Sequence, residues 1–360
     1  MKPPNDRGDP PQGSGAPPSW REDLQAAVPW VDPAALVWLG NLNAEHPWRT
    51  VVGDVRLADG RRVVLKYHTD TERMERERAA ARFLEDATAP RIAPECLGAD
   101  AARRVLVFER LSGPTLGEAL DREAARAVWR EAARVVASLH RWATDRASRW
   151  LQLCPRDGSA DRLPAYALPL EALVAPYHRA GQFGAHLTAA IAAAQQAVAE
   201  PGPWLGFTHG DLQTRHILCT ETGPRIVDWE RAGLRHRLYD LACLIEKPVN
   251  HGRRLPRWAE ESAVAESARI CALNPEEVRR ELGPVLAYER LIGVAEEQTG
   301  DLGLAEARAC LDGLLALTDR DARLAPIGEA AMALLHLLPE ESLPFYAGLD
   351  GHQAEASGLM

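Results

Sequence analysis

The segment spanning residues 207–240 constrains the fold of this chain more than any other part of its sequence. Three short apolar runs follow one another there, each of strand length, and a Thr-Gly-Pro turn separates the second from the third. The first run leads into a His-Gly-Asp turn that ends at Asp211, and the third ends at Asp228. The pattern predicts that both carboxylates stand at the ends of neighbouring strands in a hairpin-like unit. Two acids held in this way suit a proton acceptor beside a metal ligand.

These motifs, taken in order, resemble those of the aminoglycoside phosphotransferases and choline kinases, a family of small-molecule kinases that share the protein-kinase fold. The family pattern is H-x-D-x-x-x-x-N, a hairpin, and then an apolar pair followed by D. His209, Asp211 and Asp228 match it, and a Tyr-Asp-Leu-Ala segment follows at residues 239–242, as in the family. The resemblance implies that Asp211 accepts the proton of the acceptor hydroxyl, that His209 supports the turn, and that Asp228 holds a Mg²⁺ ion bridging the ATP phosphates.

One position departs from the family pattern, because His216 stands where the family has the Asn that holds a second metal ion. Asp228 and His216 are therefore the candidate metal ligands. Imidazole is a poor ligand for Mg²⁺ and suits transition metals better. Three alternatives stay open: one Mg²⁺ on Asp228 with Gln213 or Glu230 assisting, a preference for Mn²⁺, or a degenerate kinase that binds a nucleotide or a partner without turnover.

A candidate phosphate-binding lysine lies in the first third of the chain. Residues 61–67 read as a strand after a hairpin turn, with Lys66 near its end, and arginine fills nearly every other basic position. The resemblance implies that Lys66 binds the α- and β-phosphates of the nucleotide. A helix predicted over residues 70–86 would supply the glutamate that pairs with this lysine. Glu77 is the preferred partner and Glu75 the alternative.

The resemblance also implies a phosphate-covering loop and a hinge. The loop would be residues 40–47, which hold a single glycine and match no G-x-G-x-x-G pattern. An apolar run at 103–110 reads as a buried strand and leads into a Leu-Ser-Gly-Pro break. The interlobe hinge is therefore placed at residues 109–113, and the backbones of Glu109 and Leu111 are the candidate contacts for adenine.

The predicted fold class is α+β, a bilobal protein-kinase-like fold, for which 360 residues are enough. A Pro- and Gly-rich tail at residues 1–18 predicts disorder. A capping box from Ser19 to Glu22 predicts a short helix after it. The expected N-lobe, 19–110, is a small antiparallel nucleotide-binding sheet with a helix. The expected C-lobe, 111–348, is larger and mostly helical, with the catalytic hairpin and acceptor-binding helices, and a flexible tail follows at 349–360. Helices are expected at 275–282 and 284–297, or one longer helix with a kink.

Composition excludes some functional classes. A net charge of −9 argues against a nucleic-acid-binding surface. The six cysteines include no C-x-x-C pair, which argues against a zinc or redox motif and fits a reducing compartment. The sequence has no apolar run of membrane-spanning length and no signal-peptide pattern at its start, so a cytoplasmic protein without a membrane partner is expected.

The function these observations favour is an ATP-dependent O-phosphotransferase that needs Mg²⁺, or Mn²⁺ as the alternative. Its acceptor would be a small hydroxylated molecule such as an antibiotic or metabolite, in resistance or biosynthesis. One alternative is a kinase for Ser/Thr of a peptide precursor in natural-product biosynthesis. The other is a kinase-like scaffold without turnover. The acceptor, the choice between ATP and GTP, and the oligomeric state stay open.

Overall fold

The computed structural model describes residues 19–29, 31–32, 34, 36–42, 50–86, 91–121, 125–158, 182–199, 202–247, 255–297, 304–319 and 321–338. Both predicted tails, residues 43–47 of the predicted phosphate loop, and a segment at 159–181 lie outside these residues. Contacts divide the chain into two compact units, Met1–Tyr166 with Pro201–Arg279, and Ala167–Glu200 with Arg280–Met360. The N-lobe at 19–110 and the C-lobe at 111–348 are divided at the predicted hinge and not by contacts, and these boundaries stay a prediction.

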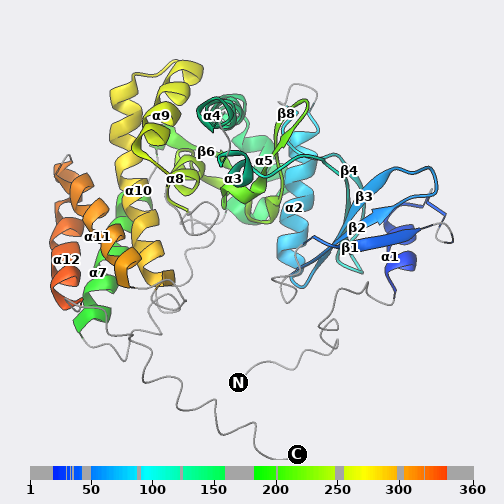
Figure 1. Ribbon diagram of the computed structural model, residues 1–360, viewed down its shortest axis with the longest axis horizontal. Helices are drawn as coiled ribbons and strands as arrows, with labels where there is room; N and C mark the ends of the chain where they lie inside the picture. The colour runs from blue at the N-terminus through cyan, green and yellow to red at the C-terminus, as the bar shows by residue number, and fades with distance from the viewer. Residues whose placement is uncertain are drawn as a thin grey trace, which may run out of the picture. The chain divides into compact units, whose positions relative to one another are not determined.

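The first unit opens with an antiparallel five-stranded sheet (Figure 1). Its strands lie in the order β1-β2-β3-β5-β4. They are β1 (Val37–Asn41), β2 (Thr50–Arg56), β3 (Arg62–His68), β4 (Cys96–Asp100) and β5 (Val105–Glu109). In this register Lys66 of β3 lies opposite Val52 of β2 and Leu106 of β5. The lysine therefore occupies a central strand, held on both sides by backbone pairing.

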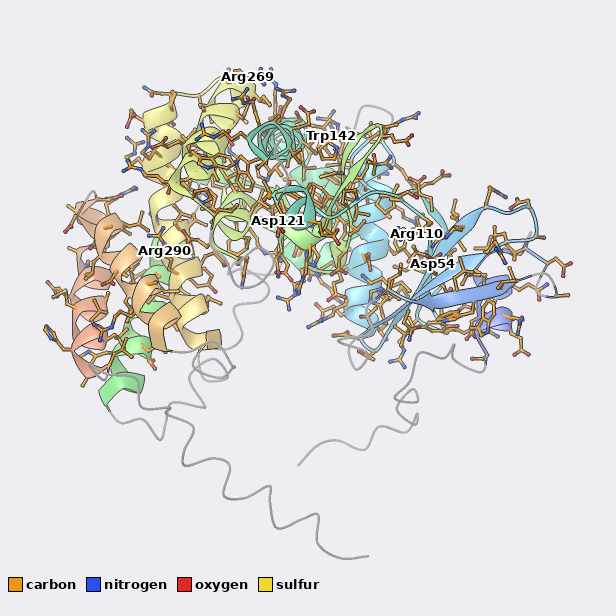
Figure 2. The ribbon with its side chains drawn as sticks, in the orientation of Figure 1. Asp54, Arg110, Asp121, Trp142, Arg269 and Arg290 are labelled. Atoms are coloured by element: carbon orange, nitrogen blue, oxygen red, sulfur yellow. The ribbon has the colours of Figure 1, made fainter. Side chains whose placement is uncertain are left out.

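One face of this sheet carries Lys66 and a group of charged side chains. Asp54 is buried on that face, where Arg62 contacts both of its carboxylate oxygens. Arg110, which follows β5, approaches the same carboxylate with Nε at 3.3 Å, and Figure 2 shows Asp54 and Arg110 side by side. Leu106 of the same face packs against Met74 of helix α2 (Thr71–Leu84).

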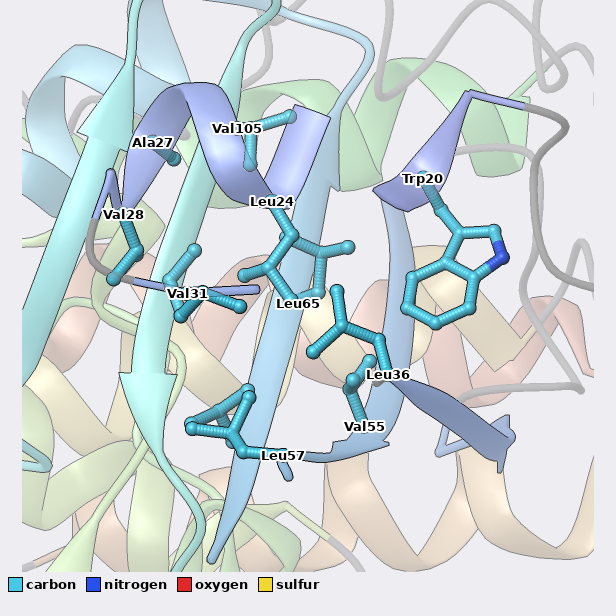
Figure 3. Close-up of a cluster of buried hydrophobic side chains, with 12 residues drawn as sticks. Trp20, Leu24, Ala27, Val28, Val31, Leu36, Val55, Leu57, Leu65 and Val105 are labelled. Atoms are coloured by element: carbon cyan, nitrogen blue, oxygen red, sulfur yellow. The ribbon is translucent and has the colours of Figure 1, made fainter. Parts of the chain in front are cut away.

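The opposite face packs on helix α1 (Trp20–Ala27), as Figure 3 shows. Side chains alternate along a strand, so the burial of Leu65 against α1 places Lys66 on the α2 face. The predicted capping box of α1 is wrong. Ser19 Oγ donates a 2.7 Å hydrogen bond to Asp23 Oδ2, a side chain within the helix, and caps no backbone amide.

The segment that carries Asp211 and Asp228 forms two small sheets. Strand β6 (Leu205–Thr208) pairs with β9 (Gly233–His236), and β7 (Ile217–Thr220) pairs with β8 (Gly223–Ile226). The hairpin predicted from the sequence is β7–β8. Asp211, however, follows β6 and Asp228 follows β8, so the two carboxylates do not end neighbouring strands of one sheet. They approach each other through the turns η5 (Thr214–His216) and η6 (Trp229–Arg231).

Helices make up most of the remaining structure. In the first unit α4 (Ala125–Ala143) packs on α9 (Arg257–Cys271). In the second unit α7 (Gln182–Ala199) and α11 (Leu304–Thr318) pack on α12 (Ala325–Leu337). A single continuous helix, α10 (Pro275–Glu297), contains Pro284, so the alternative of one long helix is the correct one. No helix in the described part of the chain has both the length and the apolar character that a membrane span needs. The further helices are α3 (Leu116–Ala119), α5 (Ala147–Leu153), η2 (Pro155–Gly158), η4 (Gly202–Trp204), α8 (Tyr239–Glu246) and η8 (Ala322–Leu324).

Candidate active site

Asp240, in the first turn of α8, holds the His-Gly-Asp turn in place. Its carboxylate accepts the backbone N–H groups of His209 and Gly210, each at 2.8 Å, and lies 3.1 Å from His140 Nε2. Burial opposes the charge of this carboxyl, but His140 and the backbone donors outweigh it and hold the pKa of Asp240 below its usual range. His140 and Asp240 together fix the conformation of the turn.

The ring of His209 joins this turn to the segment that carries Asp228. Its Nε2–H donates to the carbonyl of Val227 over 2.9 Å, and its Nδ1 accepts the N–H of Asp211 over 3.3 Å. Both ring nitrogens are therefore committed to backbone partners, and His209 is fully buried. His209 therefore links the backbone of the turn at Asp211 to the backbone just before Asp228.

Asp211 ends the turn with its carboxylate partly open to solvent. Gly210 before it has a φ of 87°, and a Cβ there would lie 2.2 Å from the carbonyl oxygen of Arg231, so the turn requires glycine. The carboxylate accepts a 2.8 Å hydrogen bond from Gln213 Nε2 and lies 3.8 Å from Arg231 Nε. Burial works against its charge, but Arg231 and His216 outweigh it and lower the pKa of Asp211. The carboxylate of Asp211 is therefore ionised at neutral pH and can accept a hydrogen bond or a proton.

Asp228 follows β8 in a left-handed backbone conformation, with φ 71° and ψ 56°. Asp tolerates this region better than most residues, and such strain is typical of functional sites. Its Oδ1 forms an ion pair with Lys66 Nζ, and its side chain is 35% exposed. Burial opposes the charge, yet Lys66 outweighs it and holds the pKa of Asp228 well below the usual range. The result is an ionised carboxylate that a cation can reach.

Three carboxylates surround Lys66. They belong to Glu77 of α2, to Glu230 of η6 and to Asp228, the residue just before η6. Lys66 Nζ lies 2.8 Å from Glu77 Oε2, pairs with Asp228, and lies 4.0 Å from Glu230 Oε2. Burial disfavours the charge of this amine, but Asp228 and the two glutamates outweigh it and raise the pKa of Lys66 above its ordinary value. The pair between Lys66 and Glu77 expected from the sequence is present, and it involves Glu77, not Glu75.

Glu77 also connects the sheet to the segment after Asp228. Its Oε1 accepts the backbone N–H of Trp229 over 3.2 Å, and its Oε2 lies 2.9 Å from His68 Nε2. Burial raises the pKa of this carboxyl, but Lys66 and His68 more than offset that effect, and the net shift is downward. A single ionised carboxylate of α2 thus contacts a lysine and a histidine of β3 and a backbone amide of η6.

His68 and Arg73 belong to this network and were missed by the sequence analysis. Glu230 accepts a 2.9 Å hydrogen bond from Arg73 Nη1, and its Oε2 lies 3.8 Å from His68 Nδ1. A usable signal existed, since His68 lies two residues after Lys66 and so on the same face of β3. Arg73 likewise lies one helical turn before Glu77.

His216 lies between the two aspartates. Its Nδ1 is 2.7 Å from the carbonyl oxygen of Asp211, and its Nε2 is 3.5 Å from Asp228 Oδ2. Burial lowers the pKa of His216, although the neighbouring aspartates act in the opposite direction. The ring is therefore neutral at pH 7 and spans the gap between the candidate base and the candidate metal ligand.

Glu109 and Leu111 lie apart from this network, at the end of β5 and just beyond it. The carboxylate of Glu109 accepts the N–H of Glu95 over 3.0 Å and Nη2 of Arg225 over 2.8 Å. Leu111 is buried, and its carbonyl accepts a hydrogen bond from Nη1 of Arg110. Their backbone contacts to a base stay a prediction.

The donor set near Asp228 fits a divalent cation that shares its coordination with phosphate. Among the residues that the structure describes, no group of three or more His, Cys, Asp or Glu side chains is arranged to hold a metal ion. Mg²⁺ in nucleotide enzymes is commonly held by one or two carboxylates together with substrate phosphates. Asp228 offers one such oxygen, and His216 Nε2 lies 3.5 Å from it.

Comparison with known proteins gives a family and a fold. Residues 52–282 match the model of a family described as the phosphotransferase enzyme family (APH). A search of curated proteins finds no significant match. A choline/ethanolamine kinase family protein from Mesorhizobium loti is 20% identical, with a TM-score of 0.51 over 87% of this chain and 98% of that one.

Two further solved structures are similar. The streptomycin–ATP–APH(2")-IIa ternary complex is 12% identical, with a TM-score of 0.54 over 83% of this chain and 97% of that one. An amicoumacin kinase in complex with AMP-PNP and Ca²⁺ is 11% identical, with a TM-score of 0.52 over 83% and 92%. At these identities the likeness shows the fold alone. The bilobal α+β kinase-like fold predicted from the sequence is confirmed.

Proposed function

Because the chain belongs to the phosphotransferase enzyme family, we propose that it transfers the γ-phosphoryl group of ATP to a hydroxyl group of a small molecule. The observation that carries this proposal is one connected network within the first unit. Lys66, Glu77 and Asp228 form its phosphate side, and Asp211 forms its acceptor side. Phosphoryl transfer asks a protein mainly for positioning and charge stabilisation, and this network supplies both.

On the phosphate side, Lys66 would contact the α- and β-phosphates with its ammonium held in place by Glu77. A divalent cation bound with the nucleotide would bridge phosphate oxygens and offset their charge, and Asp228 would hold it. In the structure Lys66 pairs with Asp228. Phosphates would compete for the lysine and so free a carboxylate oxygen for the cation.

On the acceptor side, Asp211 would accept a hydrogen bond from the attacking hydroxyl and take its proton late in the transfer. Its lowered pKa suits this order of events, because a weak base takes the proton only once the oxygen has begun to bond to phosphorus. Gln213 and the backbone of the turn hold the carboxylate for that role.

A small hydroxylated acceptor is supported by the names of the similar structures, which include a streptomycin complex and an amicoumacin kinase. The structure describes all six cysteines and joins none of them in a disulfide, which supports work in a reducing compartment such as the cytoplasm.

The experiment is transfer of label from γ-³²P-ATP to a panel of hydroxylated antibiotics and metabolites. Wild-type protein is expected to label at least one acceptor, and Asp228→Asn is expected to label none. Nucleotide binding by wild-type protein that is lost in Lys66→Ala, with no labelled acceptor, would contradict the proposal and favour a scaffold.

A further inference from the structure

The orientation of the His216 ring is fixed by one hydrogen bond. Its Nδ1 lies 2.7 Å from the backbone carbonyl of Asp211, and a carbonyl oxygen can only accept. Nδ1 therefore carries the proton, and a neutral ring presents a lone pair at Nε2. The ring is 7% exposed and sits in the turn η5, so it has little freedom to rotate.

This lone pair lies close to a carboxylate. Nε2 is 3.5 Å from Asp228 Oδ2, so two electron-rich atoms face one another. The arrangement is favourable only when a positive charge lies beside both. In this structure Arg215 approaches, and its Nε donates to His216 Nε2 over 3.2 Å. Arg215 is exposed, so a small cation could take its place.

The distance between His216 Nε2 and Asp228 Oδ2 is close to the distance expected between two ligands of one metal ion. Two ligands that each lie about 2.1 Å from one cation are roughly 3.0–3.4 Å apart at octahedral to tetrahedral angles. The observed 3.5 Å needs almost no movement to meet this. Mg²⁺ prefers oxygen ligands, whereas borderline ions such as Mn²⁺ accept imidazole nitrogen readily.

We propose that His216 Nε2 and Asp228 Oδ2 bind one divalent ion of the Mn²⁺ class in preference to Mg²⁺, together with nucleotide phosphate. The proposal rests on the proposed function, since phosphate completes the coordination. It assigns His216 a nitrogen-donor role that an Asn, with its amide oxygen, does not have. Arg215 would leave His216 Nε2 as the ion binds there.

The test uses full-length protein with AMP-PNP and Mn²⁺, followed by pulsed electron paramagnetic resonance. Wild-type protein is expected to show the ¹⁴N coupling of a directly bound imidazole. His216→Asn is expected to lose that coupling, and its Mn²⁺/Mg²⁺ affinity ratio is expected to fall about tenfold or more. His336→Asn, the same change at an exposed site, is the matched control and is expected to keep both.

Two outcomes would overturn this inference alone. One is AMP-PNP binding with Mn²⁺ but no ¹⁴N coupling in wild-type protein. The other is Mn²⁺ binding that appears only in Arg215→Ala, which would mean that the guanidinium stands permanently in place of the ion. Absence of AMP-PNP binding with either Mg²⁺ or Mn²⁺ would instead overturn the proposed function and this inference with it.

Discussion

At the scale of the residue, Lys66 neutralises carboxylates that would otherwise repel one another. Lys66→Met would leave Glu77 and Asp228 without their main cation, and breaking a buried ion pair costs about 3–5 kcal/mol. The variant is therefore expected to unfold at lower urea concentration at pH 7. Without the lysine the folded-state pKa values of these carboxyls rise, so the loss of stability is expected to shrink as the pH falls toward 5.

Asp211→Asn should separate chemistry from binding. The amide cannot take the hydroxyl proton, so turnover is expected to fall by about 10²–10⁴-fold. The residue makes no contact with Lys66 or Glu77 among the interactions described for the site, so the affinity for AMP-PNP should be unchanged within about twofold. Calorimetric titration and steady-state kinetics on one preparation check both halves. A matched loss of affinity and turnover would place Asp211 on the phosphate side.

The sequence pointed to His209, Asp211, Asp228 and Lys66 because each lies at a fixed place in a linear motif. The resemblance implied a glutamate partner for Lys66, and helical spacing favoured Glu77 over Glu75. The contacts of His68 with Glu77 and Glu230 did not, because they depend on how β3, α2 and η6 meet in space. A motif read along the chain carries no information about how these three elements pack together.

At the scale of the element, the placement of α2 decides the position of Glu77. Asp157 of η2 secures this helix, since its carboxylate lies 2.8 Å from Arg76 Nη1 and accepts the N–H of Leu234 of β9 over 2.7 Å. Trp150 Nε1 of α5 also donates to it, over 2.5 Å. One side chain that is 8% exposed therefore joins α2, α5 and β9.

Asp157→Ala is expected to destabilise the protein by about 3–5 kcal/mol, because the guanidinium of Arg76 is left buried without this partner. Since Glu77 shares α2 with Arg76, the KM for nucleotide should rise as well. Urea unfolding and kinetics measure the two effects. Asp145→Ala, at an exposed position nearby in the chain, is the control and should change stability by less than about 0.5 kcal/mol. Equal effects of the two variants would contradict this role for Asp157.

Strands and helices of this chain were predictable one by one, and their pairing was not. The apolar run before Asp211 reads as a strand, yet its partner is β9, which follows the hairpin, and not a strand of the hairpin itself. The choice is made by buried contacts such as Phe207 against Trp150 of α5, with ring centroids 4.8 Å apart. Such contacts join residues far apart in the sequence.

At the scale of the whole molecule, stability should depend on pH through histidines that fold in their neutral form. His236 is buried, with its ring stacked on Trp204, and burial lowers its pKa from the usual 6.5 to about 4. Burial also lowers the pKa of His216. A histidine whose folded pKa is depressed contributes stability that is complete above pH 6.5 and is lost as the pH falls toward the folded pKa.

The free energy of unfolding is therefore expected to fall between pH 6.5 and 4, with His236 contributing up to about 3 kcal/mol at 1.36 kcal/mol per pKa unit. His236→Phe keeps a ring beside Trp204 and removes the titration. Urea unfolding at pH 7 and pH 4.5 should show a smaller difference for this variant, with the remainder attributable to His216 and to carboxyls. An unchanged difference would show that His236 is not the titrating group.

The most direct test of the whole account is γ-phosphate release measured with water as the only acceptor, since this does not depend on identifying the natural substrate. Wild-type protein with labelled ATP and a divalent metal is expected to release phosphate slowly. Asp228→Asn is expected to abolish the release, and Asp211→Asn should reduce it by about 10²-fold. Equal release by wild-type protein and Asp228→Asn would contradict the claim that Lys66, Asp211 and Asp228 form one phosphoryl-transfer site.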